Sequence, residues 1–442
     1  MGRVYIVDED VEEYLSKLCS QQAGPVTGLL IGQSSGQRDF VVIAAPTPKD
    51  EESAGKTVDK EWVSEHARQV SRMLLGGLTV LGVFMITDAD AKDTITTLRQ
   101  LVFAVENLIS SEQKWSPAED DVTDCVTLHV NPKTRKTVCR TFDIKDPKSA
   151  AKPADLKYQS GVGSSHLYTD GKMLFNIILF KIIFLFLFQE GLKVWTRQIE
   201  NAVCLIDGKK LPEDSELTSG QKRNVRQTYT AQLAVRQEEQ RSADVVQPCG
   251  GSVTVRGAVH CRAFLHTHKP KVKLAEKRDA ISTVATRVQM LLDEPLASEE
   301  QIKDEFCLPR RIFCPLKSSG SLYVCDYQFS DEGLSEIVDR LKEMLGVDTA
   351  EEDLDTTQEM TAEITQGSAP TGERIFIYLF FFSFMLKITT PHSLPLTDSY
   401  CHMCVNVFCS FVFFLPSGLG AFMAAAAALL ATAASMMYYS DM

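Results

Sequence analysis

Three histidines and a cysteine lie close together in the sequence and could in principle bind a metal ion. His260, Cys261, His266 and His268 occupy one stretch of alternating polar and apolar residues. The three histidines share parity, so a strand would place them on one face. A zinc site would also need a fourth ligand and a turn that brings the side chains together. We therefore predict no metal site here.

Other residue patterns with known chemistry are incomplete. Gly55-Lys56-Thr57 is similar to the end of a phosphate-binding loop, but Asp50 stands where the first glycine of that motif belongs, and its carboxylate would repel phosphate. We expect a surface loop. The 401–404 stretch has the cysteine spacing of a zinc knuckle without its second half. The nucleophile elbow, the His-Glu-x-x-His pattern and the dinucleotide loop are all missing from the sequence, so we predict no catalytic residue and no cofactor.

The overall charge excludes one large class of partners. The chain of 442 residues carries a formal net charge of −12, and its Lys and Arg residues form no basic stripe. Nucleic-acid binding depends on clustered cations that displace counterions from phosphates, so we expect no nucleic-acid partner. The twelve cysteines are scattered and the N-terminus lacks the pattern of a secretory signal, which favours reduced thiols in the cytosol. Cys19, Cys125 and Cys139 have apolar neighbours and are predicted to be buried thiols.

The first 150 residues read as one mixed α/β domain. Apolar stripes at helical spacing follow Asp59 and Asp90, both suitable helix caps. Gly28, Gly32 and Gly36 lie on one strand and its turn, where we expect tight backbone packing. The predicted strands are residues 3–7, 28–32, 39–45, 78–86, 125–130 and 137–142.

A second α/β domain is predicted over residues 190–345. Its strands are expected at 203–206, 252–266, 311–315 and 321–329, and its helices at 273–292 and 331–345. The polar stretch 211–248 is predicted to be a loop, and 151–189 a linker. Residues 346–374 hold eight acidic residues against one Arg. We predict a flexible acidic linker there, because such a segment buries little apolar surface by itself.

An uncharged segment near the C-terminus is long enough to cross a membrane. Residues 418–439 would span roughly 30 Å as a helix, which matches the hydrocarbon layer. Tyrosines at its end suit the membrane interface. We predict a single C-terminal transmembrane anchor with the rest of the chain in the cytosol. The residues taken to mark it are Gly418, Phe422, Leu429, Leu430, Tyr438 and Tyr439.

Two other apolar blocks, residues 173–188 and 375–417, differ from the anchor. Both are rich in Phe, and they are interrupted by Lys181, Lys387, Pro391 and Pro395. They are poor membrane spans for that reason. Pyrimidine-rich splice-acceptor tracts, when translated, read as runs of Phe, Leu, Ser and Pro. We therefore hypothesise that both blocks derive from introns and are missing from the mature protein, which an open reading frame through both blocks in the mature transcript would refute.

Several long strings of residues resemble the odorant response abnormal protein 4 family. They are residues 1–7, 28–33, 65–74, 81–84, 139–149, 257–263 and 325–327, together with the terminal apolar helix. The resemblance implies a protein of the endoplasmic-reticulum membrane that helps a subset of G-protein-coupled receptors, odorant receptors among them, to fold and reach the cell surface. It also implies a partnership with the protease that removes a ubiquitin-fold modifier.

The amino-terminal domain is further similar to the metalloprotease-like MPN fold. In active members of that fold, the strand that corresponds to residues 78–86 leads into two histidines that bind zinc. In this sequence the run is Gly82-Val83-Phe84-Met85-Ile86-Thr87-Asp88. Met85 and Thr87 thus stand at the ligand positions, and neither offers the imidazole of a catalytic zinc site. The resemblance therefore implies a catalytically inactive binding domain.

These observations predict an adaptor rather than an enzyme. We expect a single-pass protein, anchored in the endoplasmic-reticulum membrane, whose cytosolic part binds receptors and the modifier-specific protease. Two other interpretations stay open. An MPN-type zinc peptidase would contain stoichiometric zinc, and a multi-pass membrane protein would use all three apolar blocks.

Overall fold

The computed structural model divides the chain into two compact units, Met1–Ala369 and Pro370–Met442. The structure describes residues 3–21, 24–36, 38–49, 58–117, 121–163, 166–180, 184–210, 228–234, 252–266, 272–293, 305–316, 322–359 and 362–366. All of these belong to the first unit. The predicted anchor at 418–439, the block 375–417, the motif 55–57, His268 and the 401–404 stretch lie outside the described residues.

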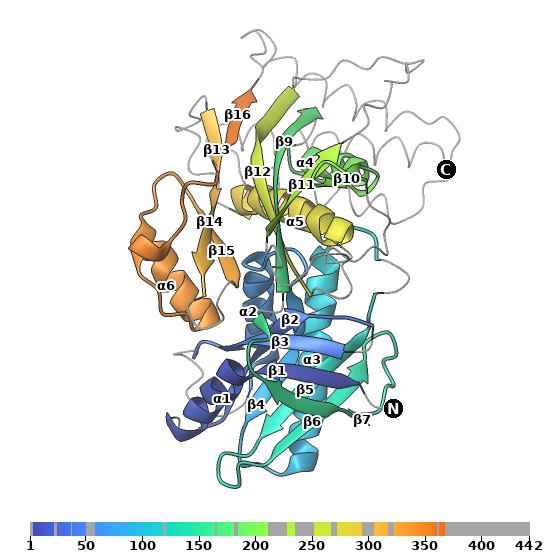
Figure 1. Cartoon of the computed structure of the whole chain (residues 1–442), viewed down its shortest axis with the longest axis vertical. Helices are drawn as coiled ribbons and strands as arrows, with labels where there is room; N and C mark the ends of the chain where they lie inside the picture. The colour runs from blue at the N-terminus through green and yellow to red at the C-terminus, as the bar shows by residue number, and fades with distance from the viewer. Residues whose placement is uncertain are drawn as a thin grey trace, which may run out of the picture. The chain divides into compact units, whose positions relative to one another are not determined.

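The first half of the unit is built on a mixed eight-stranded sheet (Figure 1). The strand order is β7-β6-β5-β4-β2-β3-β1-β8, with parallel pairing of β1 to β3 and β8 and of β4 to β5. The predicted strands 28–32 and 78–86 are neighbours in this sheet, as β2 paired antiparallel with β4. The strands are β1 Val4–Asp8, β2 Val26–Gln33, β3 Arg38–Pro46, β4 Thr79–Ile86, β5 Asp124–Val130, β6 Thr137–Asp143, β7 Lys152–Pro153 and β8 Asp155–Gln159.

Helices cover both faces of this sheet. The side chains of α2 (Lys60–Arg72) and α3 (Ala91–Glu112) share a core with one set of alternating strand residues, and α1 (Glu9–Gln21) shares a core with the other set. Asp59 caps α2 by accepting from two backbone N–H groups, and Asp90 caps α3, as predicted. The helix α1 was not predicted, although Val11, Leu15 and Leu18 repeat at helical spacing and are buried.

Two of the three glycines singled out by the sequence allow close backbone approach. A Cβ atom added at Gly28 would lie 2.4 Å from the carbonyl oxygen of Ala45, and one at Gly32 would lie 1.8 Å from that of Phe40. Gly36 has nothing within 4 Å of an added Cβ. The prediction of tight packing is therefore confirmed for Gly28 and Gly32 and wrong for Gly36.

The second half contains a six-stranded sheet, a hairpin and three helices. The six strands follow the order β10-β11-β9-β12-β16-β13, and the hairpin pairs β14 with β15. All strands and helices predicted for 190–345 are present with small shifts at their ends. The elements are β9 His166–Phe180, α4 Phe184–Glu200, β10 Val203–Ile206, β11 Thr228–Ala234, β12 Ser252–His266, α5 Val272–Asp293, β13 Glu305–Leu308, β14 Arg310–Pro315, β15 Tyr323–Gln328, α6 Leu334–Leu345, the 3-10 turn Glu351–Asp353 and β16 Ala362–Gln366.

Two segments predicted to be irregular contain regular structure. Strand β11 lies inside the predicted loop 211–248, and it is held between β9 and β10. The predicted linker 151–189 contains β7, β8, β9 and the start of α4. Within it, residues 173–180 of the first Phe-rich block pair with residues 252–259 of β12. Whether that block is intron-derived stays a prediction, because the pairing does not report on the transcript.

The acidic segment after α6 is not a flexible linker over residues 346–366, contrary to our prediction. Glu359 is 5% exposed, and its carboxylate accepts hydrogen bonds from the backbone N–H groups of His260 (2.7 Å) and Arg311 (2.9 Å) and from the guanidinium of Arg287. Asp355 exchanges two backbone hydrogen bonds with Phe313. β16 then inserts between β12 and β13. The composition of this segment alone favours disorder. It is ordered because the paired Glu359 carboxylate is buried and because the backbone pairs with neighbouring strands.

A second buried ion pair joins the two halves of the unit. Asp279 on α5 receives both terminal nitrogens of Arg311 on β14, at 2.8 and 2.9 Å, and the backbone N–H of Gly76 at 2.9 Å. Gly76 lies between α2 and β4. One hydrophobic cluster likewise contains Val63 of α2 and Phe313 of β14. The core is therefore continuous across the predicted domain boundary.

Among the described residues, no helix has both the length and the apolar character needed to cross a bilayer.

Candidate functional site

Met85 and Thr87, which the sequence resemblance sets at the zinc-ligand positions of the MPN fold, are both buried. Met85 of β4 is 4% exposed and belongs to the hydrophobic cluster beneath α2 and α3. Thr87 directly follows β4, and its hydroxyl accepts from the backbone N–H of Ala89 at 3.2 Å. A thioether in the core and a hydroxyl that stabilises a turn leave neither group available as a ligand for a catalytic zinc ion.

The histidine closest to this position also has a structural role. His129 of β5 lies opposite Met85 in the sheet, and its Nε2 atom bonds the carbonyl of Thr87 at 3.1 Å. Asp88 forms an exposed ion pair with Lys133 at 2.6 Å. Within the described ranges, no group of three His, Cys, Asp or Glu side chains could hold a metal ion.

His260 lies on β12 in contact with an aromatic ring. The ring of His260 packs edge-on against Phe313, with 5.6 Å between the ring centroids. His266 ends β12 as part of the long pairing with β9, and His268 lies outside the described residues. The predicted absence of a metal site on this strand stays a prediction.

The cysteines singled out by the sequence lie in or beside the core. Cys19 is buried, whereas Cys125 and Cys139 are half-buried. Burial raises the pKa of all three thiols, and that of Cys139 reaches about 12. A thiol with a raised pKa is a poor nucleophile at neutral pH, which agrees with a structural role for these cysteines.

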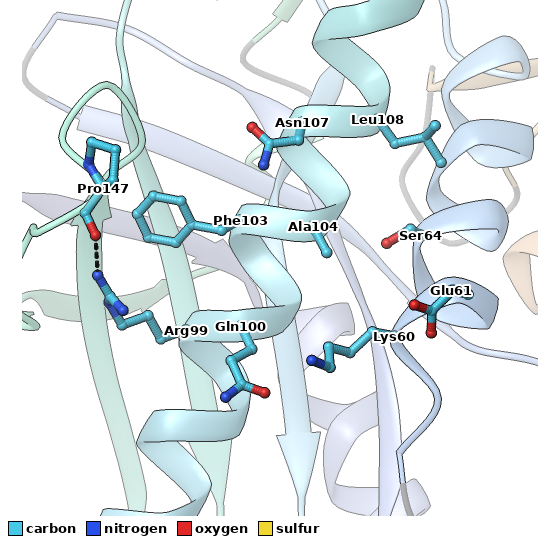
Figure 2. A pocket seen from close by; sticks show the side chains of 10 residues that line it. All are labelled: Lys60, Glu61, Ser64, Arg99, Gln100, Phe103, Ala104, Asn107, Leu108 and Pro147. Atoms are coloured by element: carbon cyan, nitrogen blue, oxygen red, sulfur yellow. Dashed lines mark hydrogen bonds between the residues drawn. The ribbon is translucent and has the colours of Figure 1, made fainter.

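A groove lies between α2 and α3 in the described part of the chain (Figure 2). It has a volume of about 620 Å³. The two helices lie side by side on one face of the eight-stranded sheet, and the loop after β6 closes one side. The groove is lined by Lys60, Glu61, Ser64, Arg99, Gln100, Phe103, Ala104, Asn107, Leu108 and Pro147.

Fixed contacts shape one wall of the groove. The Arg99 guanidinium donates a hydrogen bond to the carbonyl oxygen of Pro147 and lies 5.1 Å from the centre of the Phe103 ring. Phe103 in turn makes an edge-to-face contact with Phe142 of β6, at a centroid distance of 6.4 Å. The aromatic ring is therefore held on two sides, and one face of Arg99 is already desolvated.

Ion pairs join α2 to α3 beyond the groove. Arg68 and Arg72 of α2 reach Glu112 of α3 at 3.3 and 3.8 Å, and Arg68 also binds Glu65. Hydrogen bonding by Arg68 lowers the pKa of Glu65. The pairs hold the two helices together one turn past Leu108, so the groove is a preformed feature of the packed helices.

The sequence did not indicate this groove. Residues 100, 104, 107 and 108 share one face of α3. The helical repeat of apolar residues is enough to place this face beside the buried stripe of the helix. Their relation to Ser64 of α2 depends on how the two helices pack, and no pattern within either helix reports that.

Comparison with known proteins identifies the family. The model of the ODR4-like family, described as Odorant response abnormal 4-like, matches residues 28–356. The chain belongs to the ODR4-like family. It is 43% identical to the human protein odr-4 homolog over 393 residues, which cover 81% of this chain and 86% of that protein. It is 42% identical to the mouse protein odr-4 homolog over 389 residues, covering 81% and 87%.

The family match includes the elements that form the groove. Residues 28–356 contain α2, α3 and the loop after β6, and they end just before Glu359. Among solved structures, the crystal structure of UfSP from C. elegans is similar with a TM-score of 0.41 and 10% sequence identity, covering 79% of this chain and 57% of that one.

Proposed function

We propose that this ODR4-like chain is a non-catalytic adaptor of the endoplasmic-reticulum membrane. In this proposal, it assists the folding, trafficking and surface localisation of a subset of G-protein-coupled receptors, including odorant receptors, and recruits a ubiquitin-fold-modifier protease. Membership of the ODR4-like family over residues 28–356 is the observation on which the proposal rests.

Features of the chain itself support a binding role. Met85 and Thr87 are committed to the core and to a turn, and the conspicuous cavity is an open groove between helices rather than a pocket of converging nucleophiles and bases. Helices packed on a sheet offer a rigid surface on which partners can dock.

The uncharged segment 418–439 supplies the anchor in this proposal. The test compares a fluorescent amino-terminal fusion of the full chain with a fusion truncated after residue 417, imaged beside organelle markers. The full chain should coincide with the endoplasmic-reticulum marker, and the truncated chain should not. Replacing 418–442 by the tail anchor of an unrelated protein of the same membrane should restore the location. An unchanged location after truncation would rule out the anchor.

Receptor transport and protease recruitment are separate outcomes of the same proposal. In cells that lack the endogenous relative, expression of the full chain should raise the surface level of a tagged odorant receptor and leave an unrelated membrane protein unchanged. The modifier-specific protease should sediment with membranes only when the chain carries its anchor. Equal receptor levels and equal protease sedimentation with and without the chain would contradict the proposal.

A further inference from the structure

The floor of the groove is formed by small side chains from two neighbouring helices. Ser64 of α2 is buried, and Ala104 of α3 is half-buried between Phe103 and Leu108. The lining residues of α3 run from Arg99 to Leu108, a distance of about 14 Å along the helix. The side-chain ridges of a third helix can pack into such a groove when small residues let its axis approach those of α2 and α3. The usual distance between the axes of packed helices is about 8–10 Å.

The charges at the groove differ in sign from the chain as a whole. The chain carries a net charge of −12, whereas the groove is lined by the cations Lys60 and Arg99 and by one acid, Glu61. Figure 2 shows the amine of Lys60 directed into the gap between the two helices. Lys60 is exposed and forms no ion pair with any described residue. The amino-terminal end of α2, where Lys60 lies, adds a partial positive charge.

The backbone around the groove favours a helical occupant over an extended one. An extended peptide gains much of its affinity from backbone hydrogen bonds to a sheet edge. The two long walls of this groove are the helices α2 and α3, in which the backbone N–H and C=O groups already bond one another, and the Pro147 carbonyl on the remaining side accepts from Arg99. A partner in this groove must therefore be recognised through its side chains. A helical partner presents side chains at the same spacing as the two helices that form the groove.

We propose that the groove between α2 and α3 binds an acidic amphipathic helix of a partner protein. Apolar side chains of that helix occupy the space above Ser64 and Ala104. Its carboxylates face Lys60 and Arg99 at the open end. The inference goes beyond the proposed function, because it depends on the groove alone and holds for any cellular location of the chain.

Site-specific photo-crosslinking in cells tests the occupant directly. A benzophenone amino acid is placed at Asn107 of the full chain, and the same residue is placed at Ser20 of α1 as a control on the opposite face of the sheet. After irradiation, cross-linked peptides are identified by mass spectrometry. We expect the Asn107 product, and not the Ser20 product, to contain a segment with apolar residues at helical spacing and clustered Asp or Glu.

Three variants show whether the product depends on the groove. The double substitution Lys60→Glu and Arg99→Glu and the single substitution Ala104→Phe should each lower the yield about tenfold, the effect of losing 1.4 kcal/mol. Lys136→Glu, in the turn between β5 and β6, makes the charge change of one of these two substitutions elsewhere and should leave the yield unchanged. Replacing the acids of the identified segment by Lys should restore cross-linking to the double variant, which a folding defect could not produce.

Several results would overturn the inference. They are equal cross-linking from Asn107 and Ser20, a yield that survives both the charge and the Ala104→Phe substitutions, and a product that proves to be lipid, a second copy of this chain, or a basic or extended segment. The location of the chain truncated after residue 417 tests the proposed function alone. Whether or not that test supports the anchor, the cross-linking results decide separately whether the groove binds an acidic helix.

Discussion

Two groups of basic side chains occupy opposite environments in this protein. The side chains of Arg287 and Arg311 are 0% and 1% exposed and pair with Glu359 and Asp279. Lys60 at the groove is exposed and has no ion-pair partner in the described residues. A buried charge cannot lose its partner without a large cost, whereas an exposed charge exchanges water for a partner almost freely. Arg287 and Arg311 therefore stabilise the fold, whereas Lys60 is available to bind another molecule.

The electrostatics of Arg311 show how strongly the buried group is committed. Burial disfavours its charged form, but the Asp279 carboxylate outweighs that effect and raises the pKa of Arg311 above its ordinary value. The guanidinium also reaches the carbonyl oxygens of His260 and Leu74, both at 3.4 Å. These contacts tie α5, β14 and the end of α2 to one another.

The largest expected effect comes from removing a buried acid. Asp279→Ala should lower the free energy of unfolding by about 3–5 kcal/mol, because Arg311 would keep its charge without a partner. Chemical denaturation of the purified full chain, followed by tryptophan fluorescence, measures the change. Asp339→Ala on the exposed face of α6 is the matched control and should stay within about 0.5 kcal/mol. A small effect at Asp279 would mean that the buried pair is not what joins the two halves.

The glycines of the first sheet provide the next largest effect. Gly32→Ala should cost about 1–3 kcal/mol, since its Cβ would collide with the backbone of Phe40 on β3. Gly36→Ala meets no neighbour and should change stability by less than about 1 kcal/mol. The same denaturation experiment compares the two. Equal effects at both positions would show that β2 and β3 can separate to admit a side chain.

The comparison also explains which parts of the fold the sequence predicts. The helices after Asp59 and Asp90 and the strands β1 to β6 of the first sheet have local patterns and were predicted, whereas the short strands β7 and β8 were not. Residues 346–374 were predicted as a flexible linker because their acidic residues suggest no core. Glu359 is ordered by Arg287 and Arg311, which lie 72 and 48 residues away. No local pattern contains a partner at that distance.

The same limit applies to β11 and to the groove. Strand β11 lies in a polar stretch and is stabilised by pairing with β9 and β10 on either side. The groove requires the packing of α2 against α3, which a repeat within one helix does not encode. The absence of metal at Met85 and Thr87, which rests on the resemblance to a fold with two histidines at those positions, stays a prediction. The likeness to the MPN fold itself stays a prediction.

His66 of α2 should make stability depend on pH. Its Nε2 atom bonds the carbonyl of Met344 in α6 at 2.7 Å, and burial lowers its pKa below the ordinary value. The folded state therefore favours neutral His66, while the unfolded chain binds a proton near pH 6.5, an approximate reference value. Stability should be complete above this pH and decline as pH falls toward the folded pKa. His66→Gln should keep a donor for Met344 and remove this part of the pH dependence. Parallel stability curves for the two proteins between about pH 7.5 and 5 would contradict the assignment.

The smallest effect on stability should come from the groove itself, and it separates recognition from folding. Lys60→Glu places an acid in the first turn of α2, where the helix dipole favours negative charge, so the free energy of unfolding should change by less than about 0.5 kcal/mol. The same substitution removes one of the two cations that line the groove. Denaturation of the purified variant should therefore show nearly unchanged stability, while cross-linking from Asn107 in cells should fall. A stability loss as large as that of Asp279→Ala would instead make Lys60 part of the fold, and the contrast between the buried and the exposed cations would disappear.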